Sequence, residues 1–334
     1  MPFQTERGCS TTIPGATPGP LAQSKPANLI RREEYADDSP LFRYVLQGTP
    51  RSRAEGARLQ EQLKDAFDRP YLPGTSLKGA LRTAVAWHAW DAQGIKVDAR
   101  DLNRRRQWAA QRVERKLLGR NPNHDLLRAL HVSDSEPVEP QSLLIVNVRV
   151  HHRSGKMASP IELEAFRGDT QFRATLKLDD ALFSEWAQRR RLRLQGREWL
   201  AELPAVAQAH AADRVQREMA WFGEIENGRR VANFYRQLAG LQLGRTRFLL
   251  QIGWGTGWDD KTFGSRLQEN ERLMEHVIDR YRLARGRRNP GDPFPRSRRL
   301  AVAFTRDRQG RTDETPVAPL GWCLVEMKER DPHG

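Results

Sequence analysis

The chain has 334 residues, enough for two domains or one large domain with a proper hydrophobic core. Its formal net charge of +14 and its isoelectric point of about 10.4 favour a nucleic acid or another polyanion as partner. No apolar run approaches the roughly 18 residues of a membrane helix, and the start lacks the apolar stretch of a secretory signal. The cysteines, Cys9 and Cys323, form no metal or disulfide motif. We therefore expect a cytoplasmic protein with no membrane association, no metal and no cofactor.

Residues 1–28 are rich in Pro, Gly, Ser and Thr and show no period, which predicts a loose N-terminal arm. We expect a first domain over residues 29–180 and a second over 181–334, which includes a helical insertion. A charged helix is predicted around residues 53–67, and a strongly basic helix over residues 100–118.

The stretch Tyr71–Ala84 predicts a tight turn followed by a helix that runs to about Trp90. Thr75 or Ser76 is placed to cap that helix. Lys78 and Arg82 are one helical turn apart and share a face, and a core face is expected for Leu77, Leu81 and Ala84.

This helix start has the ingredients of a phosphate site. Its unpaired backbone N–H groups carry a partial positive charge, and the backbone of Gly74, Thr75 and Ser76 leads to the cations Lys78 and Arg82. The stretch is not a Walker A loop, because the lysine precedes the second glycine, Gly79, instead of following it. An ordinary capped surface helix is the alternative interpretation.

The rest of the chain mixes strands and helices without a regular βαβ repeat, which favours an α+β fold. Strands are predicted at 143–150, 172–178, 248–252, 300–305 and 321–327, with a hairpin tip at 153–156. Residues 181–240 are predicted to be largely helical, and an amphipathic helix is expected between residues 267 and 281.

A second glycine loop follows the strand at 248–252. Its residues are Gly253, Trp254, Gly255, Thr256, Gly257 and Trp258, with Lys261 close behind. Glycines let a backbone approach a ligand, tryptophans offer stacking surface and lysine offers charge, a combination that suits single-stranded nucleic acid. The G-x-G-x-G spacing does not fit a dinucleotide-binding fold. The alternative is a structural turn whose tryptophans belong to the core.

Several stretches together resemble the RAMP (repeat-associated mysterious protein) superfamily of CRISPR-associated proteins. They are Pro73–Arg82, His131–Ser135, Glu164–Phe172, Gly253–Lys261 and Pro319–Trp322. In this order and length they are most similar to the family of fifth subunits of type III-A (Csm) effector complexes.

The resemblance implies tandem ferredoxin-like, RRM-related RAMP domains with helical insertions. It also implies a non-catalytic subunit that caps the 3′ end of the CRISPR RNA and supports its maturation in antiviral defence. The implied partners are CRISPR RNA, the other RAMP subunits of a Csm complex and host nucleases. The family's usual first strand has no convincing counterpart in residues 1–28.

Two other functions stay open at this point. RAMP nucleases cut RNA without metal, and the pair His151 and His152 beside Arg153 could serve a metal-independent endoribonuclease. The alternative for this pair is two exposed histidines at a strand end. The chain could also be a RAMP subunit of another type III complex. No residue is assigned a catalytic role.

Overall fold

The computed structural model describes residues 39–329 except 53, 55, 56, 226, 285, 287, 290, 307, 308, 310 and 311. The predicted arm over residues 1–28 lies outside the described residues. No helix within this described part is long and apolar enough to cross a membrane.

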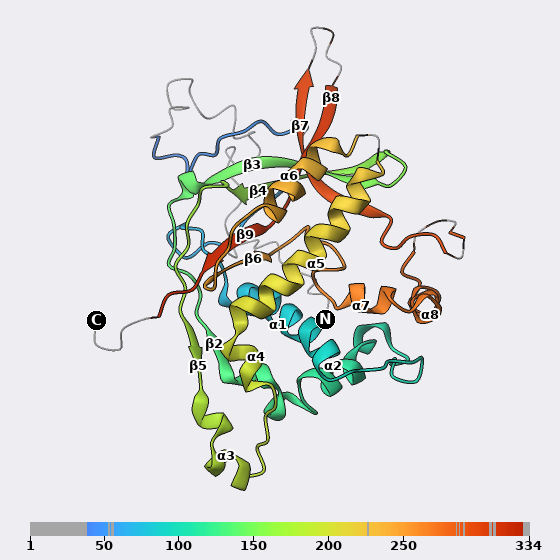
Figure 1. Ribbon diagram of the computed structural model, residues 1–334. Coiled ribbons are helices and arrows are strands. Elements are labelled where there is room, and N and C mark those ends of the chain that lie inside the picture. The colour runs from blue at the N-terminus through green and yellow to red at the C-terminus, as the bar shows by residue number, and fades with distance from the viewer. Residues whose placement is uncertain are drawn as a thin grey trace, which may run out of the picture.

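The largest sheet has five strands in the order β1-β4-β3-β7-β8. The strands are β1 (Leu59–Gln60), β4 (Met157–Phe166), β3 (Leu143–His152), β7 (Ser297–Arg306) and β8 (Thr312–Pro319). All neighbours are antiparallel except β1 and β4. β3 and β4 form a hairpin, and the turn between them contains the predicted tip at residues 153–156. β7 and β8, from the end of the chain, extend the sheet upward in Figure 1.

Two small antiparallel sheets complete the β-structure. One pairs β2 (Leu130–Val132) with β5 (Leu176–Leu178). The other pairs β6 (Arg247–Gln251) with β9 (Trp322–Glu326) and packs against the helices. β6 ends directly before the glycine loop at residue 253, so this small sheet fixes where the loop begins.

Two long helices organise the rest of the chain (Figure 1). They are α1 (Gly74–Ala92) and α5 (Leu203–Gly223), and the shorter helices are α2 (Gln111–Leu118), α3 (Glu185–Arg189), α4 (Arg197–Ala201), α6 (Arg229–Ala239), α7 (Gly264–Gln268) and α8 (Glu271–Tyr281). One hydrophobic core joins residues of α1, α2, α5 and β6 to residues of α7 and α8. A second, smaller core lies between the end of α5, α6 and Leu300 of β7.

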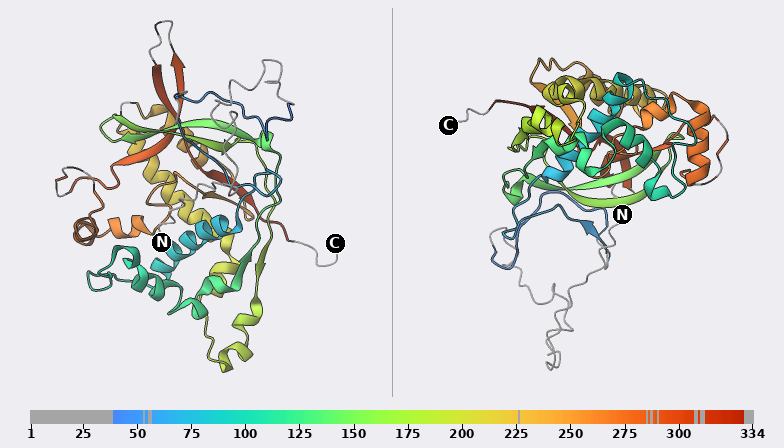
Figure 2. Two further views of the ribbon diagram at one scale, coloured as in Figure 1. Left: turned by 180° about the vertical axis from the view of Figure 1, so that it is seen from behind. Right: turned by 90° about the horizontal axis from the view of Figure 1, so that it is seen from below.

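A largely irregular segment lies on the other face of the large sheet and joins its edge through β1; we call the described residues of 44–64 the strap. Figure 2 (right) shows the helices on one side of β3 and β4 and the blue strap on the opposite side. Buried polar side chains of the sheet accept hydrogen bonds from strap backbone N–H groups. Asn147 accepts from Arg51 at 2.9 Å, and Glu162 accepts from Ser52 at 2.7 Å. These bonds satisfy backbone groups that no strand partner satisfies.

Glu164 fixes both ends of the strap. Its carboxylate is almost fully buried and accepts from Tyr44 Oη at 2.8 Å, from the backbone of Gln62 at 2.8 Å and from Lys64 Nζ at 2.5 Å. Lys64 also lies over the Tyr44 ring, 4.7 Å from its centre. Glu164, the first residue of the stretch Glu164–Phe172 that carries part of the family resemblance, thus anchors the strap.

The predicted α+β class is confirmed, and most predicted elements lie where expected. The helix predicted at 53–67 is wrong for the described residues, which form β1, turns and irregular chain, with Gln62 and Lys64 bonded to Glu164 of β4. Residues 53, 55 and 56 of this prediction lie outside the described residues. The strand predicted at 172–178 is shorter, and the basic helix predicted at 100–118 becomes a 3₁₀ turn at Arg106–Trp108 followed by α2. The boundary between 180 and 181 stays a prediction; the large sheet and the main core both take residues from each side of it.

Candidate nucleic-acid interface

The start of α1 is held by an internal anion. The backbone N–H of Gly74 donates to the Asp134 carboxylate at 2.7 Å, and Pro73 occupies the N-cap position without a side-chain cap. The predicted capping role of Thr75 or Ser76 is therefore wrong: both residues lie inside the first turn. Part of the helix-end charge is already satisfied by the protein itself.

The turn before α1 is packed closely against the end of β2. Ser135 accepts from Leu72 N–H through its hydroxyl at 2.9 Å and donates its own N–H to the Leu72 carbonyl at 2.9 Å. A methyl group on Gly74 would lie 2.5 Å from the Ser133 carbonyl oxygen. This internal contact explains why position 74 is a glycine, so the glycine is no evidence for a ligand site.

One face of α1 stays open to solvent. Thr75, Lys78, Gly79 and Arg82 recur at helical spacing and are exposed or half-buried, whereas Leu77 and Leu81 on the other side are buried. Lys78 forms no hydrogen bond or ion pair with any residue in the described part of the chain. A side chain on Gly79 would meet open space. This exposed basic stripe agrees with the predicted face.

Arg82 is only partly available. Its Nη1 donates to Asp125 at 2.9 Å, and Glu114 lies 3.7 Å from Nη2. Asp125 in turn accepts the backbone N–H of Leu127 and caps the 3₁₀ turn before β2. Arg82 therefore supports the local fold, which leaves Lys78 as the stripe's unpaired cation among described residues.

The second loop has the backbone that its glycines predict. Gly253, Gly255 and Gly257 have φ values of +91°, +88° and +103°, in the region that favours glycine. Gly255 lies against Leu320, 2.8 Å from where its Cβ would stand. Thr256 is buried and its hydroxyl lies 3.4 Å from the Gly253 carbonyl.

The two tryptophans of the loop have different roles. Trp254 is 40% exposed, and the guanidinium of Arg299 on β7 lies 5.0 Å from the centre of its ring. Trp258 packs against the main core, edge-on to Phe294 at 5.2 Å. Trp254 thus offers stacking surface for a base. Trp258 instead contributes to the core, as the alternative interpretation of the loop predicts.

A buried ionic cluster lies directly behind this loop. It comprises Arg214 and Glu218 of α5, Asp259 and Asp260 at the end of the loop, and Arg298 of β7, which we call the ionic cluster. Arg214 lies 3.2 Å from Asp260, 3.4 Å from Asp259 and 3.2 Å from Glu218. Arg298 Nε donates to both carboxylate oxygens of Glu218 at 2.9 Å. The cluster joins the loop to α5 and β7.

Burial and charge act in opposite directions in the ionic cluster. Burial raises the pKa of Asp260 to about 6 and raises that of Asp259, although Arg214 opposes both shifts. Burial also acts to raise the pKa of Glu218, but Arg298 and Arg214 outweigh it and lower the net value. The ionic cluster contains three carboxylates and two guanidiniums, so each buried charge depends on partners from other parts of the chain.

Two cations meet at the outer side of the loop. The pKa of Lys261 is lowered by desolvation and by the nearby charge of Arg299. Arg299 also lies over the exposed Trp254 ring, so this ring has a cation beside it whose charge acts on Lys261 as well. A bound phosphate would offset the repulsion between Lys261 and Arg299, and a base would stack on the Trp254 ring.

The two motifs are linked through α1 but do not touch at its start. Trp87 donates to Ser265 at 3.0 Å, and Trp90 packs on Phe263 at 5.5 Å, so the second half of α1 contacts the residues that follow the loop. Gly74 is 13 residues before Trp87, about 20 Å along the helix. No hydrogen bond or ion pair joins Gly74–Arg82 to Gly253–Lys261 among the described residues.

The histidine pair does not form a surface site. His151 is 1% exposed and packs edge-on to Trp221 at 6.5 Å, and burial lowers its pKa. The interpretation of two exposed histidines is therefore wrong for His151, because its strand position faces the interior. His152, the last residue of β3, is half-buried. No group of three potential metal-binding side chains lies together within the part that the structure describes.

Sequence reasoning missed the ionic cluster and Asp134. The spacing of Arg214 and Glu218, one turn apart on a helix, was a weak sign of the first. Asp134 lies in the stretch His131–Ser135, which the sequence flags only by resemblance. Neither pattern reveals which distant residue it pairs with.

Parts of this chain are similar in sequence to known proteins. Over 269 residues the chain is 22% identical to the CRISPR system Cms protein Csm5 of Methanocaldococcus jannaschii, covering 78% of this chain and 63% of that relative. It is 31% identical over 125 residues to Csm5 of Mycobacterium tuberculosis, covering 30% of this chain and 33% of the relative. The chain thus spans less than two thirds of these relatives' lengths.

Solved structures agree in fold. The chain is similar to one in a Csm–crRNA–target RNA ternary complex of a type III-A CRISPR-Cas system, with a TM-score of 0.58 and 23% identity over 85% of this chain and 78% of that one. Its TM-score with T.onnurineus Csm5 is 0.51, at 23% identity over 80% of this chain and 73% of that one. These likenesses confirm the predicted RAMP fold. Residues 35–258 match the sequence profile of the RAMP superfamily. This chain belongs to the RAMP superfamily.

Proposed function

We propose that this chain is a non-catalytic RNA-binding subunit of a type III-A CRISPR effector ribonucleoprotein in the cytoplasm. In this role it caps the 3′ end of the CRISPR RNA and supports its maturation. Its partners are CRISPR RNA and neighbouring RAMP subunits, with host nucleases recruited for trimming. Similarity to Csm5 proteins and a net charge of +14 support the proposal.

The observation that carries the proposal is the exposed Trp254 ring with Arg299 over it, in a loop that is followed by the exposed Lys261. The ring is offered to a base, and the two cations are offered to phosphates. Glycines at both sides let the RNA backbone approach the loop closely. None of these contacts reads a base edge, which suits a subunit that must accept many spacer sequences.

A 3′-exonuclease protection assay tests the capping role. The complex is reconstituted from this chain, the other RAMP subunits of a type III-A complex and a CRISPR RNA of defined length, and is then treated with a 3′→5′ exonuclease. The wild-type chain should protect a longer 3′ segment than the complex without it, and a Trp254→Ala, Lys261→Gln variant should lose that protection. Equal trimming with and without the chain would contradict the proposal.

Cleavage by the chain itself is tested separately. Purified protein is incubated with labelled precursor RNA in EDTA. We expect no cleavage, because His151 is buried and so cannot reach a ribose 2′-hydroxyl. Cleavage that disappears in a His151→Ala, His152→Ala variant would replace the proposal with the endoribonuclease function.

A further inference from the structure

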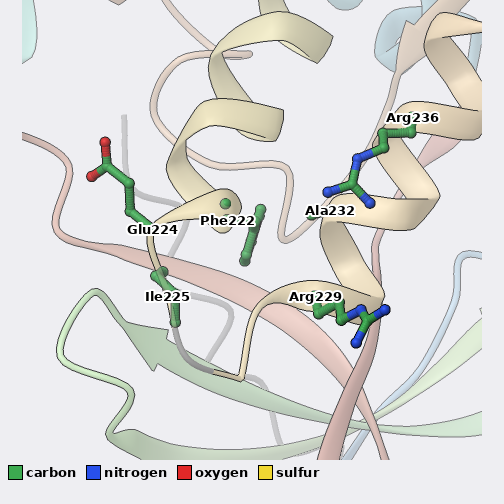
Figure 3. A pocket seen from close by; sticks show the side chains of 7 residues that line it. Phe222, Glu224, Ile225, Arg229, Ala232 and Arg236 are labelled. Carbon is green, nitrogen blue, oxygen red and sulfur yellow. The ribbon is translucent and has the colours of Figure 1, made fainter.

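A second concave surface lies between the end of α5 and the start of α6. Its cavity of about 560 Å³ is lined by Phe222 and Ile225 from the α5 end and by Arg229 and Arg236 from α6. Figure 3 shows both arginines on α6 across from Glu224, with Phe222 between the two sides. No motif described above includes these residues.

The arginines give this pocket an unbalanced positive charge. Arg229 and Arg236 are two helical turns apart and exposed, and neither forms an ion pair with a residue in the described ranges. Arg236 donates to the neutral side chain of Asn233. Glu224 is the one carboxylate among the described lining residues, and it already forms an ion pair with Arg153.

The shape and chemistry indicate what the pocket takes. A guanidinium forms paired hydrogen bonds to the oxygens of an anion, and a phosphate has oxygens enough for two such groups, whereas a carboxylate has only two. The volume lies in the range of small-molecule sites, which runs from about 300 to 1,000 Å³. Phe222, Ile225 and Ala232 form the floor of the pocket but are buried, so the chemistry that the pocket offers to a ligand is that of the two arginines.

We propose that this pocket binds the phosphate group of a nucleotide, between Arg229 and Arg236. The nucleotide comes either from a single-stranded RNA or from a free mononucleotide, which share this chemistry. The inference does not depend on 3′-end capping. It concerns residues outside Gly253–Lys261, so a Trp254→Ala variant distinguishes its failure from that of the proposed function.

The test uses the full chain and two probes, AMP and a labelled single-stranded RNA of mixed sequence. The Arg229→Gln, Arg236→Gln variant is compared with wild type and with Arg230→Gln. Arg230 is an exposed residue on the same helix that does not line the cavity. The Arg230→Gln control therefore removes an arginine charge from α6 without changing the pocket. Because all three side chains are exposed, thermal unfolding should stay the same and verify that each variant is folded.

In the double variant, affinity for at least one probe should fall by about tenfold or more, because two charge-assisted contacts are lost. Arg230→Gln should stay within about twofold of wild type. If RNA is the ligand, the salt dependence of its binding should also fall by roughly 0.7 in log–log slope, because one phosphate contact is lost.

Each outcome decides the matter. A loss with RNA alone supports the pocket with RNA as its source, and a loss with AMP alone supports it with a free nucleotide. Wild-type affinity for both probes in the double variant overturns the proposal. Unchanged binding of both probes with impaired assembly with another RAMP subunit also overturns it, and assigns the pocket to an acidic protein partner.

Discussion

Arg214 on α5 lies 3.2 Å from Asp260 at the end of the glycine loop, and both side chains are buried. The surface proposed to hold RNA is thus attached to the protein interior by charge. Asp259 and Asp260 follow Trp258 directly, so the ionic cluster limits movement of the loop that presents Trp254. Rigid support of this kind reduces the conformational entropy that the loop would lose on binding.

Replacing Arg214 with methionine should lower the free energy of unfolding by about 3–5 kcal/mol. The change leaves three buried carboxylates facing Arg298 alone. Arg217→Met on the same helix is the control, since its partner Asp213 and its own side chain are partly exposed and such a pair contributes about 1 kcal/mol or less. Urea unfolding measures both, and equal losses would mean that the ionic cluster is not essential to the fold.

Asp260 should give the chain an unusual dependence on pH. Its pKa rises from 3.8 to about 6 in the folded protein, so the folded state keeps a proton that the unfolded chain has released. Its contribution to stability therefore falls as pH rises from about 4 to 6, by about 3 kcal/mol in total at 1.36 kcal/mol per unit. The free energy of unfolding of the Asp260→Asn variant should not show this decline between pH 4 and 6. Parallel curves for the variant and wild type would refute the shift.

His210 should act with the opposite sign in the same window. Its pKa falls from 6.5 to about 4, chiefly because the ring is buried, so the unfolded chain gains a proton before the folded one does. Stability from His210 is complete above about pH 6.5 and is lost as pH falls toward 4. His210→Gln should not lose this stability at low pH. In urea unfolding over the same pH range, only the effect of Asp260 then remains, so the free energy of unfolding should fall more steeply with rising pH than in the wild type. No change in slope would contradict the assignment.

Two glycines of α1 should respond oppositely to alanine. At Gly74 the new methyl group would lie 2.5 Å from the Ser133 carbonyl, and we expect a loss of about 1–3 kcal/mol. At Gly79 the methyl group meets no protein atom within 4 Å, and Ala is the better helix former by about 1 kcal/mol. Thermal unfolding should thus separate the two. If RNA packs on the exposed stripe, Gly79→Ala should also weaken RNA binding in spite of the gain in stability.

The sequence was sufficient for elements with strong local patterns. The amphipathic spacing of α1 and the β-branched run of β3 predicted their type and approximate bounds. The strap was mistaken for a helix because its charged residues suit a helix locally, and its true partners, Asn147, Glu162 and Glu164, are about 100 residues away in the chain. Pairings at such a distance leave no periodic trace.

The candidate site was predicted in composition but not in detail. Spacing alone placed Lys78 and Arg82 on one face. It could not show that Arg82 pairs with Asp125, or that Asp134 accepts a hydrogen bond from the first residue of the helix. Likewise, alternation in the second loop does not reveal which tryptophan packs against the core. That difference depends on Phe294, which lies 36 residues after Trp258 and packs against it.

The strap should detach when its anchor is removed. Glu164→Ala leaves the buried Lys64 ammonium group without its carboxylate and takes the acceptor from Tyr44 and Gln62. We expect a loss of about 3–5 kcal/mol and faster cleavage by protease within residues 44–64. Glu136→Ala, at an exposed position, is the control. Wild-type resistance to protease in Glu164→Ala would show that other contacts hold the strap.

RNA affinity of Trp254→Ala across a salt series tests the central claim most directly. Base stacking on an aromatic ring contributes about 1–3 kcal/mol, so affinity should fall by roughly fivefold to 150-fold while the salt dependence stays nearly unchanged. Trp186→Ala is the matched control, because Trp186 is 60% exposed on α3 and has Arg190 over its ring. Lys78→Gln should instead lower the salt slope by about 0.7. Wild-type affinity in Trp254→Ala at every salt concentration would contradict the account.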